Sequence, residues 1–278
     1  ASTHDTILFF TDKGRVFALK AYEVPEVSRQ AKGQAIINLI NVEPKEEIQA
    51  VLTTASDLSS ASEYLVLATQ NGLVKKTKLA AFKNIRSSGI IAIHLTSQDR
   101  LIWVKQTSGN HHLMLVSRAG KAIRFHEKDV RPSGRNTKGV KGLRLKKDDR
   151  VIGMAAFPET PPPTSGRKKV FLDILVVTQK GLGKRTSVSE FPVHKRAGSG
   201  VKVAEVTGKT GPVSAAIPVD QRIQQVVITS KKAQVIKLPL KNIKRLHRAS
   251  QGVILMRFTH PDDIVAAVTT ISTEQTAP

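Results

Sequence analysis

The chain has 278 residues, 40% of them hydrophobic, which is enough for one large all-β domain or two ordinary domains. Its 44 Lys and Arg against 22 Asp and Glu give a formal charge of +22 and indicate a polyanionic partner. The absence of cysteine excludes disulfides, thiolate metal sites and cysteine nucleophiles. With no signal-peptide pattern and no run approaching roughly 20 apolar residues, we expect neither secretion nor membrane insertion.

The positive charge is unevenly distributed along the chain. Residues 1–62 hold 6 basic and 8 acidic side chains, whereas residues 111–169 hold 15 basic and 5 acidic ones. We therefore expect the middle of the chain to contribute more to binding a polyanion than its beginning.

A predicted β-hairpin recurs five times. Its first strand is apolar and runs into a turn in which a Ser or Thr is followed three residues later by Gly, or by Ala in the fifth copy. Glycine at this place supplies a positive φ in a tight turn. The first strands are expected at 7–11, 65–69, 113–117, 174–178 and 225–229.

Two further strands follow each hairpin. A loop of about a dozen residues ends on a recurring glycine, at positions 33, 89, 139, 200 and 252. Third strands are predicted directly after it, at 35–40, 90–95, 140–145, 201–206 and 253–258. Fourth strands are predicted at 48–53, 101–105, 151–156, 213–217 and 264–268.

Four short strands in each period indicate an all-β fold of radially arranged four-stranded blades, because one such sheet cannot bury both faces alone. We predict a single domain over 1–278, a propeller-like disc with repeats at about 5–55, 63–107, 111–157, 170–219 and 222–271. Residues 56–62 are expected to be a linker, 158–169 a surface insertion and 272–278 a frayed tail.

Cations recur at two places in the repeat. An arginine precedes each loop glycine, and a Lys or Arg stands four residues after the turn glycine or alanine in four of the five hairpins. If the blades form a ring, these side chains would make a basic band along its rim, suited to a curved polyanion. The alternative is that their stems cover apolar edges or protect outer strands from aggregation. The candidate set is Arg29, Lys32, Lys75, Lys76, Arg86, Arg124, Arg135, Lys138, Lys141, Lys184, Arg185, Lys195, Arg196, Lys237 and Arg248.

The composition favours duplex DNA over a single strand, because base stacking needs exposed aromatics and most of the nine Phe, two Tyr and one Trp lie in strand patterns.

No catalytic site is predicted. The acidic pairs at 46–47, 148–149 and 262–263 precede fourth strands, where Asp favours turns, and Asp99 stands alone in the matching place. His111 and His112 have no further ligand at metal-binding spacing.

The repeats resemble the C-terminal domain of the bacterial DNA gyrase A protein. The resemblance is carried by residues 3–5 with 14–17, by 71–77, by 183–186 and by 252–255, and it extends from residue 3 to about 271. It implies a five-repeat β-pinwheel whose blades exchange strands, with duplex DNA bent around a basic perimeter. It also implies a cytoplasmic, chromosome-associated type II topoisomerase that introduces negative supercoils, with the gyrase B protein and the rest of the gyrase A protein as partners. This fragment is expected to be monomeric and to hold no cofactor, while ATP, magnesium and the catalytic groups belong to other parts of the holoenzyme.

The chain departs from the family pattern in two ways. Five repeats are present instead of six, and the repeat that bears the gyrase-A box is missing. The box survives only in degenerate form at 194–200, 28–33 and 134–139. Two alternatives therefore stay open: the C-terminal domain of the topoisomerase IV A protein, and a protein-interaction scaffold with a basic rim and no DNA wrapping.

Overall fold

The computed structural model describes residues 2–28, 30–54, 63–159 and 172–272. These residues form two compact units, and each is described by itself. The first unit comprises residues 1–110 and 127–141, and the second comprises 111–126 and 142–278. The predicted linker 56–62, all but the first residue of the predicted tail 272–278 and most of the insertion at 158–169 lie outside the described residues. The single domain stays a prediction.

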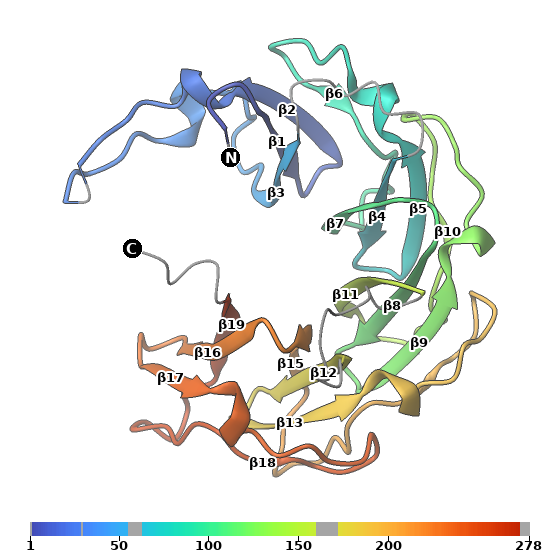
Figure 1. The fold of residues 1–278 in the computed structure, drawn as a ribbon, viewed down its shortest axis with the longest axis vertical. Coiled ribbons are helices and arrows are strands. Elements are labelled where there is room, and N and C mark those ends of the chain that lie inside the picture. The colour runs from blue at the N-terminus through green and yellow to red at the C-terminus, as the bar shows by residue number, and fades with distance from the viewer. Residues whose placement is uncertain (1, 29, 55–62, 160–171, 273–278) are drawn as a thin grey trace, which may run out of the picture. The chain divides into compact units, whose positions relative to one another are not determined.

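The first unit contains two four-stranded antiparallel sheets (Figure 1). One has the order β3-β1-β2-β6, with strands Thr6–Thr11 (β1), Arg15–Lys20 (β2), Ile48–Thr54 (β3) and Ile90–Ile91 (β6). The other has the order β10-β5-β4-β7, with strands Tyr64–Thr69 (β4), Leu73–Lys78 (β5), Leu101–Thr107 (β7) and Val140–Lys141 (β10).

The second unit contains three sheets. The first has the order β11-β8-β9-β14, with strands His111–Ser117 (β8), Lys121–His126 (β9), Val151–Pro158 (β11) and Val201–Lys202 (β14). The next has the order β15-β12-β13-β18, with strands Leu172–Thr178 (β12), Leu182–Ser187 (β13), Val213–Asp220 (β15) and Val253–Ile254 (β18). The last is three-stranded, β17-β16-β19, with strands Ile223–Ser230 (β16), Val235–Pro239 (β17) and Val265–Ser272 (β19).

The recurring Ser or Thr closes the hairpin turn through its hydroxyl group. Thr69 Oγ1 accepts the backbone N–H of Leu73 at 3.2 Å, and the first, third and fifth hairpins have the equivalent bond. The turn residue three positions later has a positive φ, which is 82° at Gly72 and 63° at Ala233 in the fifth copy. The predicted hairpins are confirmed, and this bond explains why the hydroxyl residue recurs with the glycine.

Neighbouring repeats exchange strands, as the resemblance implied. The two-residue third strand of each later repeat pairs with the hairpin of the repeat before it, as β6 does with β2 and β18 with β13. These strands are shorter than the six residues predicted. The predicted strand at 35–40 is wrong: the short 3₁₀ helix Ile36–Asn38 (η2) stands there, because no preceding hairpin is present among the described residues to accept a strand.

The sequence pattern does not predict the short 3₁₀ helices that follow the hairpins. They begin where the second strand ends and, from the second repeat on, each buries at least one side chain. They are Ala21–Glu23 (η1), Leu79–Phe82 (η3), Glu127–Asp129 (η4), Val188–Glu190 (η5) and Leu240–Asn242 (η6).

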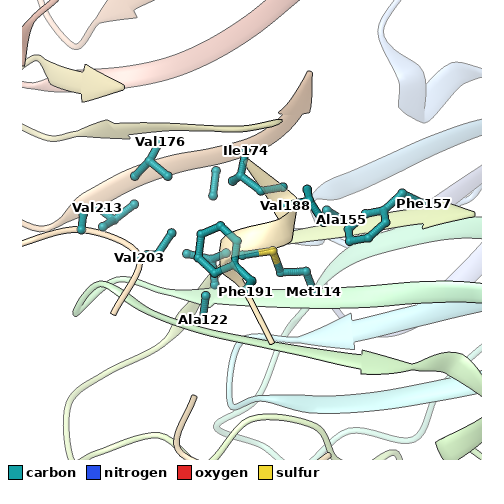
Figure 2. Close-up of a cluster of buried hydrophobic side chains, with 13 residues drawn as sticks. Met114, Ala122, Ala155, Phe157, Ile174, Val176, Val188, Phe191, Val203 and Val213 are labelled. Atoms are coloured by element: carbon teal, nitrogen blue, oxygen red, sulfur yellow. The ribbon is translucent and has the colours of Figure 1, made fainter. Parts of the chain in front are cut away.

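Within each unit the main core lies between successive sheets. In the second unit Met114 and Ala155, from the sheet of β8, pack with Ile174 of β12 and with Phe191 after η5 (Figure 2). In the first unit a corresponding cluster forms around Phe10 and Phe82, whose rings meet edge to face. Most members are less than 5% exposed, so stacking of the sheets supplies the burial that one blade cannot provide.

Candidate nucleic-acid interface

The long loops of the third, fourth and fifth repeats each cross the hairpin of the preceding repeat and are fixed to it at both ends. At the start, the Ser133 and His194 amides donate to the carbonyls of Lys76 and Arg124 at 2.9 and 2.8 Å. Leu246 makes the equivalent bond to Arg185 at 2.8 Å. At the end, the loop passes directly into the exchanged strand. The loop backbone is therefore held on a folded support.

The loop glycines of the fourth and fifth repeats are required by close backbone approach. A Cβ on Gly200 would lie 2.3 Å from the Ala122 carbonyl oxygen, and one on Gly252 would lie 2.7 Å from that of Gly183. Both glycines also have positive φ, 68° and 91°. Any other residue would push the loop away from the hairpin that carries it.

The predicted loop cations lie largely in contact with solvent. Lys32, Arg86, Lys138 and Lys195 are exposed, and Arg135, Arg196 and Arg248 are half-buried. Lys141, at the end of β10, is exposed as well. Arg29 lies outside the described residues. Among the residues that the structure describes, the side chains of Arg86, Arg135, Lys138 and Arg248 form no ion pair with a carboxylate. Their charge is available to a bound anion.

Loop cations from successive repeats come together in the first unit. Lys83 and Arg86 of the second repeat and Arg135 of the third line one open depression of about 630 Å³. In the second unit the Glu205 amide donates to the Ser250 carbonyl at 3.3 Å, so the fifth repeat's loop lies beside the end of the fourth repeat's exchanged strand. The repetition thus brings cations of neighbouring loops together in the first unit, and it places the loop backbone of the fifth repeat next to the fourth repeat in the second unit.

The hairpin lysines are placed differently from what the sequence suggested. Lys75, Lys76 and Lys184 are 1%, 4% and 1% exposed, and their ammonium groups donate to backbone carbonyls. Burial is the main cause that lowers their pKa, to about 8 for Lys75 and Lys184. Enclosed ammonium groups cannot touch a phosphate, so these three do not belong to a contact surface in this structure.

The side chains of the hairpin arginines also donate hydrogen bonds to backbone carbonyl groups. Arg124 Nη1 donates to the carbonyls of Val188 and Phe191 at 3.2 and 3.3 Å, and Arg185 Nε to that of Ile243 at 2.9 Å. Lys237, by contrast, is exposed on β17, which has no further strand on its outer edge among the described residues. Most cations at this hairpin position therefore bond to backbone carbonyl groups of the fold. This structural role differs from the predicted alternative, in which their stems cover apolar edges or protect outer strands.

Sequence reasoning missed one cation position. Lys83, Arg131 and Lys244 each follow the buried apolar residue that closes a 3₁₀ turn, and all three are exposed. The signal was available as a basic residue three or four positions before the loop arginine in repeats two, three and five. Pro192 replaces it in the fourth repeat.

The acidic residues before the fourth strands form turns, as predicted. Asp99 Oδ1 accepts the amides of Asn71 and Arg100 at 2.9 Å, and Asp263 Oδ1 those of Lys232 and Ile264 at 3.1 and 2.8 Å. In the described part of the chain no group of three or more His, Cys, Asp or Glu could hold a metal ion. No helix in these described segments is long and apolar enough to span a bilayer.

Comparisons with known proteins agree on one family. The sequence matches the family described as DNA gyrase C-terminal domain, beta-propeller, over residues 5–55, 63–108, 111–158, 172–220 and 224–271. It is 41% identical over 256 residues to the DNA gyrase A protein of Staphylococcus epidermidis, covering 92% of this chain and 27% of that protein. It is 40% identical over 265 residues to the DNA gyrase A protein of Salmonella typhimurium, covering 95% of this chain and 29% of that protein.

Solved structures give the same result. The C-terminal domain of DNA topoisomerase IV has a TM-score of 0.85 at 28% identity, covering 98% of this chain and 80% of that chain. The DNA gyrase A C-terminal domain has a TM-score of 0.76 at 25% identity, covering 97% of this chain and 83% of that chain. The chain spans less than a third of the curated relatives it matches, in keeping with a C-terminal part.

Proposed function

Because this chain belongs to the DNA gyrase C-terminal domain family, we propose that it binds duplex DNA on its long loops and bends or wraps it. The main support for the proposal is that Lys83, Arg86 and Arg135, which come from two successive repeats, line one open depression. Phosphates spaced along a duplex backbone match such a row of cations, and contacts of this kind position DNA without reading its sequence.

The energetic cost of bending DNA explains why several cations are needed and not one. A bend of 40 to 90 degrees in a site of 20 to 30 base pairs costs on the order of 1–6 kcal/mol, which several phosphate contacts must offset. In the parent enzyme, wrapped DNA would be presented for strand passage. Supercoiling would then depend on ATP, magnesium and catalytic residues in the rest of the gyrase A protein and in the gyrase B protein, acting on the cytoplasmic chromosome.

The experiment is a titration of fluorescent duplex DNA with the purified chain at several salt concentrations. Affinity should fall steeply between 50 and 200 mM salt, with a log–log slope of roughly 0.9 for each phosphate neutralised. Binding that does not depend on salt would refute the proposal. Relaxing a plasmid with a topoisomerase in the presence of the chain then tests wrapping, since a scaffold that binds acidic proteins would leave the linking number unchanged.

The same assay bears on the choice between gyrase and topoisomerase IV. Identity of about 40% to gyrase A proteins favours gyrase, whereas the topoisomerase IV domain is a close structural relative. A large change in linking number for each bound chain would support a gyrase-type wrap. Binding with little change in linking number would support the topoisomerase IV alternative. Light scattering at the same concentrations tests the proposed monomer.

A further inference from the structure

Two buried lysines occupy the same place in the second and fourth repeats. Lys75 and Lys184 stand three residues after the turn glycines Gly72 and Gly181, on β5 and β13. Each is 1% exposed. Among the described residues neither ammonium group forms an ion pair with a carboxylate within 4 Å. A buried charge without a direct ion pair is costly, so the presence of such a charge at two equivalent places needs an explanation.

Both ammonium groups donate to the loop of the following repeat. Lys184 Nζ lies 2.6 Å from the His247 carbonyl oxygen, 2.7 Å from that of Arg248 and 3.2 Å from Ser250 Oγ. Lys75 Nζ donates to the carbonyls of Arg135 and, at 2.8 Å, Ala92. In each case one acceptor is the carbonyl oxygen of the loop arginine itself.

The side chains of these arginines make a second matching contact. Arg248 Nη1 donates to the Lys202 carbonyl at 3.2 Å, and Arg135 Nη1 to that of Ile91 at 3.5 Å. Lys202 and Ile91 are the last residues of the exchanged strands β14 and β6. Each arginine is thus held at its backbone by the buried lysine and at its guanidinium by the preceding repeat's strand, once in each compact unit.

The corresponding position in the third repeat shows that packing alone does not need a lysine. Ile123 stands there, fully buried, with its Cδ1 3.3 Å from where a Cβ on Gly198 would lie. An apolar side chain can therefore fill the space beneath a loop of this kind. The ammonium group adds the bonds to the loop carbonyls.

We propose that Lys75 and Lys184 are positioning residues that hold Arg135 and Arg248 in the geometry in which they contact the DNA backbone. The inference rests on the proposed function. The two lysines do not touch DNA; they act through the loop arginines, so their effect on DNA binding should disappear when those arginines are absent.

The protonation of the two lysines supplies a test. Burial, together with the nearby positive charge of Arg135, lowers the pKa of Lys75 to about 8. Burial likewise lowers the pKa of Lys184 to about 8, with Glu190 opposing this effect and Arg248 adding to it. Raising the pH from about 7.5 to about 9 therefore neutralises both groups and weakens their bonds to the loop carbonyls, while arginines and ordinary surface lysines stay charged.

The main experiment compares the full chain with Lys75→Met/Lys184→Met in duplex binding at fixed salt. Lys78→Met/Lys241→Met is the matched control, because both of these lysines are exposed and the same charge is removed. The Lys75→Met/Lys184→Met variant should bind duplex DNA about fivefold or more weakly than wild type, as expected for weakened charge-assisted contacts. The Lys78→Met/Lys241→Met control should lose less than about twofold in affinity. Wild-type affinity should fall between about pH 7.5 and 9, whereas that of the buried-pair variant should stay nearly constant.

A double-mutant cycle tests whether Lys184 acts through Arg248. Lys184→Met should weaken binding in the wild-type background and have little further effect in Arg248→Ala. A DNA-free readout is limited trypsin digestion, which should cut after Arg135 and Arg248 faster in the methionine variants. Should those variants fail to fold, the wild-type pH profiles of affinity and of cleavage at these two arginines still test the proposal.

The outcomes separate the two proposals. If wild type binds no DNA, the proposed function fails, while faster cleavage in the methionine variants would still support the role of the lysines in holding the loops. If wild type binds with steep salt dependence but the buried-pair variant binds equally well, or if the effects of Lys184→Met and Arg248→Ala simply add, the positioning role is overturned.

Discussion

The Asp173 carboxylate on β12 accepts two hydrogen bonds from Arg245, from Nε at 3.0 Å and Nη2 at 2.7 Å. Arg185 Nη1 lies 3.7 Å from its other oxygen. Asp173 is 1% exposed, so one buried carboxylate joins a core strand of the fourth repeat to the long loop of the fifth. Arg245 is a loop cation whose charge serves the fold.

Replacing Asp173 should destabilise the chain strongly. Asp173→Ala would leave two guanidinium groups facing each other without their shared acceptor, and we expect a loss of about 2–4 kcal/mol in the free energy of unfolding. Arg222→Ala is the control, because it breaks an ion pair to Asp220 in which the arginine is 69% exposed, and it should cost less than about 1 kcal/mol. Urea unfolding measures both; similar losses would contradict the assigned role of Asp173.

The loop glycines give a second prediction about stability. Gly200→Ala places a Cβ 2.3 Å from a backbone oxygen at a φ of 68°, so the loop must shift and the chain should lose about 1–3 kcal/mol. Gly33→Ala is its natural control, because a Cβ there meets nothing within 4 Å and the φ is not in the left-handed region. It should be neutral or slightly stabilising in a thermal melt. A substantial loss at Gly33 would mean that the first repeat's loop is packed differently.

The strand pattern of the repeats could be predicted from the sequence because it depends on local chemistry. The hydroxyl residue, the turn glycine and the preceding apolar run mark the hairpin whatever surrounds it. The loop glycines could be located in the same way, although their cause, the approach of a carbonyl from the preceding repeat, could not.

What could not be predicted depends on contacts between repeats. Residues 35–40 have the apolar pattern of a third strand but form none, because strand formation at this place requires the preceding repeat's hairpin. Lys75 and Lys76 are consecutive, so alternation would place at least one of them in solvent, yet both are enclosed by the following repeat's loop and 3₁₀ turn. A basic residue in a sequence gives no indication that carbonyl groups from 50 or more residues away will cover it.

The buried lysines make stability depend on pH in a defined direction. Their pKa is about 8 in the folded chain against an ordinary value of 10.5, so between these limits the unfolded chain binds more protons. The free energy of unfolding should therefore rise with pH in this window through these two groups. The gap between wild type and Lys75→Met/Lys184→Met should shift in favour of wild type from about pH 7.5 to 10. Lys78→Met/Lys241→Met should show no such change; a gap that shifts the other way would contradict the burial of the charged forms.

The uneven charge along the chain gives the last prediction. Arg135→Ala/Lys138→Ala removes two cations from the loop of the most basic repeat, whereas Arg29→Ala/Lys32→Ala removes two from a repeat surrounded by acidic residues. The first pair should weaken duplex binding more, because the repulsion of the phosphates by nearby carboxylates already limits the contribution of the second. If both residues of the first pair contact phosphates, the log–log salt slope should fall by roughly 1.8 in magnitude, and by less for the second pair. Equal losses in affinity and slope would show that the loops contribute alike and that the charge asymmetry does not direct the DNA.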